Sequence, residues 1–189
     1  MARKTKGKTW FTIISPKFLG EKEIGRTLVS DPKALKGRKV VVALTDLVNN
    51  LSKYYMKLIF KIEDIKDSTA LTSFDGSECL HDYISRMVLK RTRRVDAVQD
   101  LKTKDGVSIR VKSIAIIPKR VKSSIKRAVR DKIREVVKDE VESVSLEEFV
   151  ENMISDKLRK KVLVEARKVY PVRNFEIRKT EVLGKFKSG

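Results

Sequence analysis

The sequence is poor in the residues on which most catalytic and metal sites depend. It has one cysteine, Cys79, and one histidine, His81. A single histidine excludes a metal site built from several histidines, and two residues two positions apart on a helix are poorly spaced as a ligand pair. No nucleophile motif, dinucleotide-binding fingerprint or spaced set of catalytic carboxylates is present. We therefore expect no catalytic residue, no metal, no cofactor and no small-molecule substrate, and we predict that the protein is not an enzyme.

Disulfides and long apolar runs are missing as well. One cysteine excludes an internal disulfide framework and fits a reducing compartment. No apolar run approaches the roughly 18 residues that a membrane-spanning helix needs. The basic N-terminus is followed by FTIISPKF rather than by a long apolar core, which is not the pattern of a signal peptide. We expect a cytoplasmic protein with no membrane partner.

Acidic residues are too few to balance the basic ones. The 189 residues include 44 Lys and Arg against 25 Asp and Glu, a formal net charge of +19. A domain with this surplus repels itself unless a polyanion neutralises it. Nucleic acid is the favoured polyanion; an anionic membrane surface is the rival, but a membrane binder would more typically carry its bases on one amphipathic helix. The surplus is concentrated in residues 89–134, with 16 bases and 4 acids, whereas residues 135–156 hold 1 base and 8 acids and suit a basic neighbour.

Hydrophobic periodicity predicts strands in the first two thirds of the chain and helices after them. Alternating residues predict strands at 10–16, 54–65 and 172–183, a strand at 69–74 that could pair with 54–65, and a hairpin around Asp105-Gly106. The β-branched run Val40 to Val42 predicts a buried strand at 39–47. Residues 17–37 are charged and punctuated by Gly and Pro, so we expect an extended loop there. Apolar spacing of three or four predicts helices at 78–89, after Pro118, at 145–153 and at 157–169.

These elements predict an α+β fold, with a mostly antiparallel sheet or open β-barrel core and about four helices packed on it. Ser123 or Ser124 is expected to cap the helix after Pro118, and Asp156 the helix at 157–169. In the helix at 145–153, Ser145 precedes Glu147 and Glu148, acids that are well placed against the helix dipole. We expect residues 1–9 to form a basic arm that is disordered in the free protein, residues 10–183 a single α+β domain, and residues 184–189 a basic tail.

Two basic segments are candidates for binding a polyanion. Lys122, Lys126, Arg130 and Arg134 recur every four residues on the long helix, and residues 119–134 hold eight bases and one acid. So few acids favour contact with RNA or DNA over a merely solvated face. The second segment, KRTRRVD at 90–96, lies at the junction of a predicted helix and the hairpin. There we expect Arg91 and Arg93 to face the polyanion and Arg94 to face elsewhere.

The aromatic content gives a weaker indication. Trp10 and Phe11 follow the basic arm and could stack on an unpaired base, but we favour a core role for both.

Several blocks in order resemble the archaeal and eukaryotic small-subunit ribosomal protein family S-one-e, also written S-three-Ae. They are WFTIISPKFLGEKEIGRTLVSDP, LKGRKVVVALTDL, FKIEDIKDSTALTSFDGSE and KTKDGVSIRV. The chain departs from the family in having Ala43 where a small polar residue is common. It also lacks the long C-terminal extension of eukaryotic members, which suggests an archaeal origin.

The resemblance implies a structural constituent of the small ribosomal subunit that binds rRNA of the platform, near the mRNA exit and the 3′ end of the small-subunit rRNA. Neighbouring ribosomal proteins, and mRNA near the exit, are the other implied partners. A free-standing RNA chaperone or translation regulator acting off the ribosome is the alternative. The candidate rRNA-binding residues are Arg3, Lys4, Lys6, Lys8, Lys90, Arg91, Arg93, Arg94, Lys119, Arg120, Lys122, Lys126, Arg127, Arg130, Arg134, Lys157, Arg159, Lys160 and Lys161.

Overall fold

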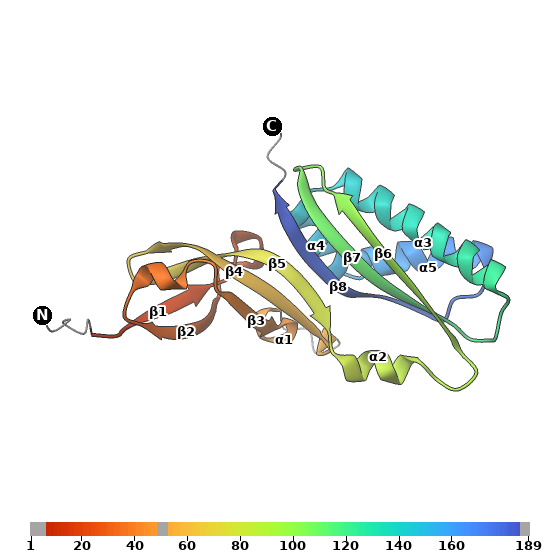
Figure 1. The fold of residues 1–189 in the computed structure, drawn as a ribbon, viewed down its shortest axis with the longest axis horizontal. Helices are drawn as coiled ribbons and strands as arrows, with labels where there is room; N and C mark the ends of the chain where they lie inside the picture. Colours follow the sequence, from red (N-terminus) through yellow and green to blue (C-terminus); the bar gives the residue numbers. More distant parts are fainter. Residues whose placement is uncertain (1–6, 49–52, 186–189) are drawn as a thin grey trace, which may run out of the picture. The chain divides into compact units, whose positions relative to one another are not determined.

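The structure is a computed structural model that describes residues 7–48 and 53–185 (Figure 1). The chain forms two compact units, residues 1–77 (unit one) and residues 78–189 (unit two). The fold class is α+β: the described strands form a mixed, mostly antiparallel eight-stranded sheet, and four described helices have seven residues or more. The predicted fold class is confirmed. The expected boundaries of arm, single domain and tail stay predictions.

Unit one is built from strands. Its elements are β1 (Thr9–Ile14), η1 (Lys17–Leu19), β2 (Glu23–Val29), η2 (Pro32–Leu35), β3 (Lys39–Ala43), α1 (Leu44–Leu47), β4 (Met56–Lys66) and most of β5 (Thr69–Cys79), where η marks a 3-10 helix. β1 pairs antiparallel with β2 and parallel with β5, while β4 pairs with β3 and β5. Alternation places Met56, Leu58 and Phe60 of β4 in the interior, because successive side chains of a strand face opposite sides.

Unit two packs three helices beside a three-stranded antiparallel ladder. Its elements are α2 (His81–Met87), β6 (Arg93–Lys102), β7 (Val107–Ile117), α3 (Ser123–Ser143), α4 (Leu146–Ile154), α5 (Lys157–Val169) and β8 (Asn174–Lys185). β7 is the middle strand, between β6 and β8. α3 lies along β6, and α5 packs against α3 and β8 (Figure 1). Fully buried Val111, Val129, Ile133 and Val162 come from the strands and helices that meet there.

The β6–β7 turn also fixes where α4 begins. Gly106 has a φ of +74°, a left-handed conformation that glycine adopts without steric cost, and its N–H donates to the carbonyl of Thr103 at 2.9 Å. The carboxylate of Asp105 accepts from the backbone N–H of Leu146, the first residue of α4, at 3.0 Å. Ser145 caps α4 in a capping box with Glu148. The hairpin turn is therefore tied to the N-terminus of α4.

Three local predictions are wrong. Residues 17–37 are not an extended loop, because they contain β2, which pairs with β1 but buries only Val29 and so shows no hydrophobic alternation. The strand expected at 39–47 ends at Ala43, where the four-residue helix α1 follows. Neither Ser123 nor Ser124 caps α3: Lys122 occupies the N-cap position and makes no side-chain cap bond. Asp156 does occupy the N-cap position of α5, but without a side-chain cap bond.

Candidate nucleic-acid interface

Strand pairing brings three basic segments to one end of unit two. Arg93, at the start of β6, lies opposite Ile117, at the end of β7, and Lys119 follows two residues later. The backbone N–H of Arg173, just before β8, donates to the carbonyl of Ile116 at 2.8 Å. The α2–β6 turn, the β7–α3 link and the segment after α5 therefore meet at the same end of the ladder.

The α2–β6 turn holds the first half of the KRTRRVD run. The N–H and hydroxyl of Thr92 both donate to the carbonyl of Leu89, at 3.2 and 2.6 Å, which closes a tight turn over Lys90 and Arg91. Arg91 has a φ of +66°, uncommon for a residue with a side chain. Both side chains are exposed. The turn thus presents two cations side by side in a left-handed bend that ordinary sequence patterns do not predict.

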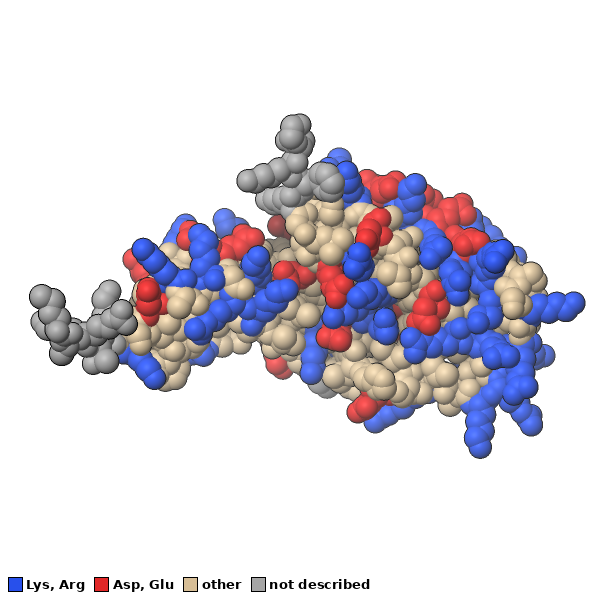
Figure 2. Space-filling view, in the orientation of Figure 1, with Lys and Arg blue, Asp and Glu red and all other residues tan. Residues whose placement is uncertain are grey.

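The link to α3 and its first turns supply the remaining cations. Lys119, Arg120, Lys122 and Arg127 are exposed, and Lys126 is half-buried. Within residues 7–48 and 53–185 no ion pair to a carboxylate is recorded for these side chains, nor for those of the turn or Arg173. We call this set the basic end: Lys90, Arg91, Arg93, Lys119, Arg120, Lys122, Lys126, Arg127 and Arg173. Figure 2 shows Lys and Arg gathered at the right-hand extremity, where Figure 1 draws the start of α3.

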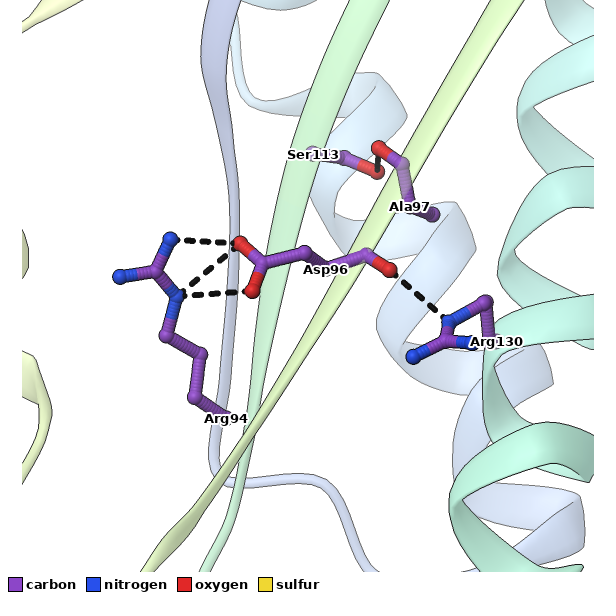
Figure 3. A network of polar contacts seen from close by, with 5 residues as sticks. All are labelled: Arg94, Asp96, Ala97, Ser113 and Arg130. Carbon is purple, nitrogen blue, oxygen red and sulfur yellow. Dashed lines mark hydrogen bonds and ion pairs between the residues drawn. The ribbon is translucent and has the colours of Figure 1, made fainter.

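Of the four cations spaced by four residues along α3, the last two, Arg130 and Arg134, contact the protein itself. Arg130 donates from Nε to the carbonyl of Asp96 at 2.9 Å (Figure 3), and Arg134 reaches the carbonyl of Val98 at 3.5 Å. β6 is the last strand in the order of the sheet, so its outward carbonyls have no strand partner on that side. Arginine donors at such an edge satisfy the carbonyls and block pairing with another chain. The two residues hold α3 against β6; whether they also bind rRNA stays a prediction.

The side chain of Arg94 faces away from α3 (Figure 3). Its guanidinium forms a bidentate pair with the Asp96 carboxylate, with Nη2 to Oδ1 at 2.7 Å and Nε to Oδ2 at 2.9 Å (Figure 3). The neighbouring Val95 is buried beneath α3, because adjacent strand residues face opposite sides. Arg94 is therefore a paired cation, unlike Arg93.

At the start of α5 the four predicted residues divide in the same way. Arg159 pairs with the buried carboxylate of Glu176 at 3.1 Å, and Lys161 pairs with the buried Glu140 at 2.5 Å. Removing one partner of such a pair leaves an uncompensated buried charge, so both cations have a structural role. Lys157 and Lys160 are exposed. Of the arm residues, Arg3, Lys4 and Lys6 lie outside the described residues, and Lys8 is exposed.

Comparison with known proteins shows the family of the chain. Residues 2–185 match the Ribosomal S3Ae family. The chain belongs to this family. A relative from Methanothrix thermoacetophila, named small ribosomal subunit protein eS1, is 38% identical over 182 residues, 96% of this chain and 86% of the relative. A relative with the same name from Methanopyrus kandleri is 34% identical, over 95% of this chain and 87% of the relative. Another from Sulfurisphaera tokodaii is 35% identical, over 95% of this chain and 93% of the relative. The resemblance found in the sequence, including its archaeal character, is confirmed.

A second cluster of cations in this S3Ae-family chain lies around a pocket of about 600 Å³ in unit two. Arg94, Lys112, Arg178 and Lys179 line it together with residues of α2. Lys112 and Lys179 share the carboxylate of Glu181, each at 3.0 Å, and these hydrogen bonds, first that of Lys112, lower the pKa of Glu181. The same carboxylate raises the pKa of Lys179. Because three of its four cations pair with carboxylates, the pocket is a weaker polyanion site than the basic end.

The sequence alone did not reveal Arg173 and Arg178. Arg173 follows Pro171 in a short connection without periodicity, so only the hydrogen bond to Ile116 shows that it joins the basic end. Arg178 lies where the β7–β8 register shifts, between the pairs Lys112–Lys179 and Ser113–Ile177. A bulge re-aims a side chain, and strict alternation cannot predict it.

No helix in the described part of the chain is long and apolar enough to cross a membrane.

Proposed function

We propose that the protein is a structural constituent of the small ribosomal subunit and that it binds rRNA through the basic end of unit two. The observation that carries the proposal is a cluster of nine cations, on three converging segments, for which no carboxylate partner is recorded among the described residues. Membership of the Ribosomal S3Ae family and relatives named small ribosomal subunit protein eS1 support it. Cations held without internal partners are available to an external polyanion.

Binding at this end is electrostatic in origin. Each Lys or Arg that contacts a phosphate releases condensed counterions, so the affinity falls as salt rises. Arginine forks can hold a phosphate through two parallel hydrogen bonds, and lysine acts as a point charge. Such contacts position the protein on folded rRNA without reading its sequence. We infer that the rRNA fold supplies specificity, and that the protein neutralises phosphates where strands approach one another.

The family resemblance suggests the place of binding. We propose rRNA of the platform, near the mRNA exit and the 3′ end of the small-subunit rRNA, with mRNA and neighbouring small-subunit proteins as further partners and the cytoplasm as the compartment. The acidic segment 135–156 exposes Glu142, Glu147, Glu148 and Glu151 on α3 and α4, away from the basic end in sequence. A neighbouring protein with a basic surface suits this segment.

Sedimentation tests the proposal against its alternative, an RNA chaperone or translation regulator acting off the ribosome. In a cell extract the tagged full chain should co-migrate almost entirely with small subunits, and it should remain there after a wash at moderate salt. Recovery mainly in the slow-sedimenting fractions at low salt would refute a constitutive place in the subunit and favour the alternative. A variant with Gln at Lys119, Arg120 and Lys122 should leave the subunit at a lower salt concentration than the native chain.

A further inference from the structure

Trp10 does not have the core role that the sequence favours. Its side chain is 63% exposed, whereas the neighbouring Phe11 is 4% exposed and belongs to the core of unit one with Ile13 and Val29. Alternation along β1 explains the difference, because Phe11 faces inward and Trp10 therefore faces water. Trp10 is also the only tryptophan in the sequence. A large ring left in water at a strand position is available to a partner.

The residues around Trp10 combine one apolar neighbour with hydrogen-bond donors. In the β1–β2 register Trp10 lies opposite Leu28, which is 41% exposed, and Thr12 lies opposite Arg26. Trp10 and Thr12 share one face of the strand by alternation, and the exposed Lys8 lies directly before β1. Nε of Arg26 donates to the carboxylate of Glu23 at 2.7 Å, so this cation is already paired within β2. An aromatic face thus lies beside a cation on a two-stranded surface.

The charge of this region selects a polyanion as the occupant. The first 20 residues contain five bases, Arg3, Lys4, Lys6, Lys8 and Lys17, and no acid. A stable protein interface buries about 800 Å² on each partner around an apolar centre. Here the apolar surface consists of one ring and Leu28, with Lys8, Thr12 and the Arg26–Glu23 ion pair around them. An exposed ring beside a cation is an arrangement by which proteins hold unpaired nucleotides.

We propose that Trp10 stacks on an unpaired base of RNA, with Lys8 contacting a flanking phosphate. The site lies in unit one and involves none of the residues of the basic end. It rests on the RNA-binding function proposed above, but it adds a different kind of contact. Stacking is tolerant of base identity, because every base has an aromatic face, and it requires a base outside a duplex.

The single tryptophan makes the test direct. The full native chain is titrated at constant salt with short oligoadenylate and oligouridylate, and with a duplex RNA of the same length, while tryptophan emission is followed. Stacking should quench the emission on binding either single strand, and the duplex should quench it much less. Binding of the single strands, seen by anisotropy of a labelled RNA, with unchanged tryptophan emission would overturn the stacking proposal and leave the proposed function intact. Absence of binding to either single strand would also overturn the stacking proposal, whereas the proposed function is overturned only if the chain fails to bind folded small-subunit rRNA.

Variants separate stacking from other uses of the surface. Trp10→Leu keeps an apolar side chain but loses the ring and should weaken single-strand binding roughly 5- to 100-fold, whereas Trp10→Phe should retain most of the affinity. Tyr54→Leu, at a 52% exposed ring outside β1 and β2, is the matched control and should bind like the native chain. Thermal unfolding should be nearly unchanged in the Trp10 variants, since the ring is exposed. Normal RNA binding by Trp10→Leu would refute the proposal. If that variant bound RNA normally but failed to enter small subunits, the ring would instead contact a protein partner.

Discussion

Replacing Lys119, Arg120 and Lys122 together by Gln removes one third of the basic end. Lys119 and Arg120 lie in the β7–α3 link and Lys122 is the N-cap residue of α3. All three are exposed, and no ion pair is recorded for them in the described part of the chain. The formal charge falls by three, from +19 to +16. If each side chain contacts one phosphate, the slope of log K against log salt should become shallower by about 2 to 3. The native chain should then lose roughly 30-fold more affinity than the variant over a fourfold rise in salt.

A control variant removes the same charge from cations that the structure pairs internally. Arg110, Lys132 and Lys168 pair with Asp100, Glu135 and Glu165 at 2.6, 3.0 and 2.6 Å. Their replacement by Gln also gives +16, but it should change the salt slope by less than about one. Filter binding of the three full-length proteins to in vitro transcribed small-subunit rRNA, from low to moderate salt, measures the slopes. Equal slopes for the two variants would show that net charge, rather than the basic end, determines binding.

Three further predictions concern the supports of the interface. Arg130→Met keeps the aliphatic length but removes the donor to the edge of β6. Chemical denaturation should therefore show a free energy of unfolding lower by about 1 kcal/mol, while rRNA affinity should change less than twofold. A large loss of affinity with unchanged stability would assign Arg130 to rRNA instead. Ser145→Ala should lower the free energy of unfolding by about 1 kcal/mol, because the α4 cap and its bond to the N–H of Glu148 are lost, and a Ser145→Asp control should restore most of it. The pKa of Glu181 is lowered by Lys112 and Lys179, so its contribution to stability is present above the ordinary carboxyl pKa and is lost as the pH falls through the lowered value. Denaturation of the native chain between about pH 6 and pH 3 should therefore show a decrease that Glu181→Gln reduces, and identical pH profiles would contradict the assigned pair.

Much of the fold could be predicted because its elements satisfy local rules. β4, the β6–β7 hairpin and α5 each combine regular periodicity with a clear start or stop, such as Gly106 in a left-handed turn. β2 could not be predicted in this way, since an edge strand with one buried residue has no hydrophobic alternation, and its partner β1 stabilises it. The boundary at Ala43, where β3 gives way to α1, likewise depends on surrounding packing rather than on the β-branched run that precedes it.

The candidate interface was only partly predictable, because sequence shows charge but not its neutralisation. Lys119 and Arg159 look alike as residues in basic segments. The structure leaves the first in solvent and pairs the second with the buried Glu176, which is 17 residues away in sequence and on β8. Similarly, Arg130 follows the four-residue spacing of Lys126 but donates to the backbone of β6. Pairing between residues far apart in sequence can be identified only once the fold is known.

Crosslinking within assembled small subunits, mapped on the protein by mass spectrometry, tests the central claim most directly. Ultraviolet crosslinks between rRNA and the native chain should fall at the basic end, on the α2–β6 turn, the 118–127 segment and the residues around Arg173. They should be rare on the acidic helices, where Glu142 and Glu151 lie. Small subunits that contain the chain but give rRNA crosslinks only outside the basic end would contradict the proposed interface.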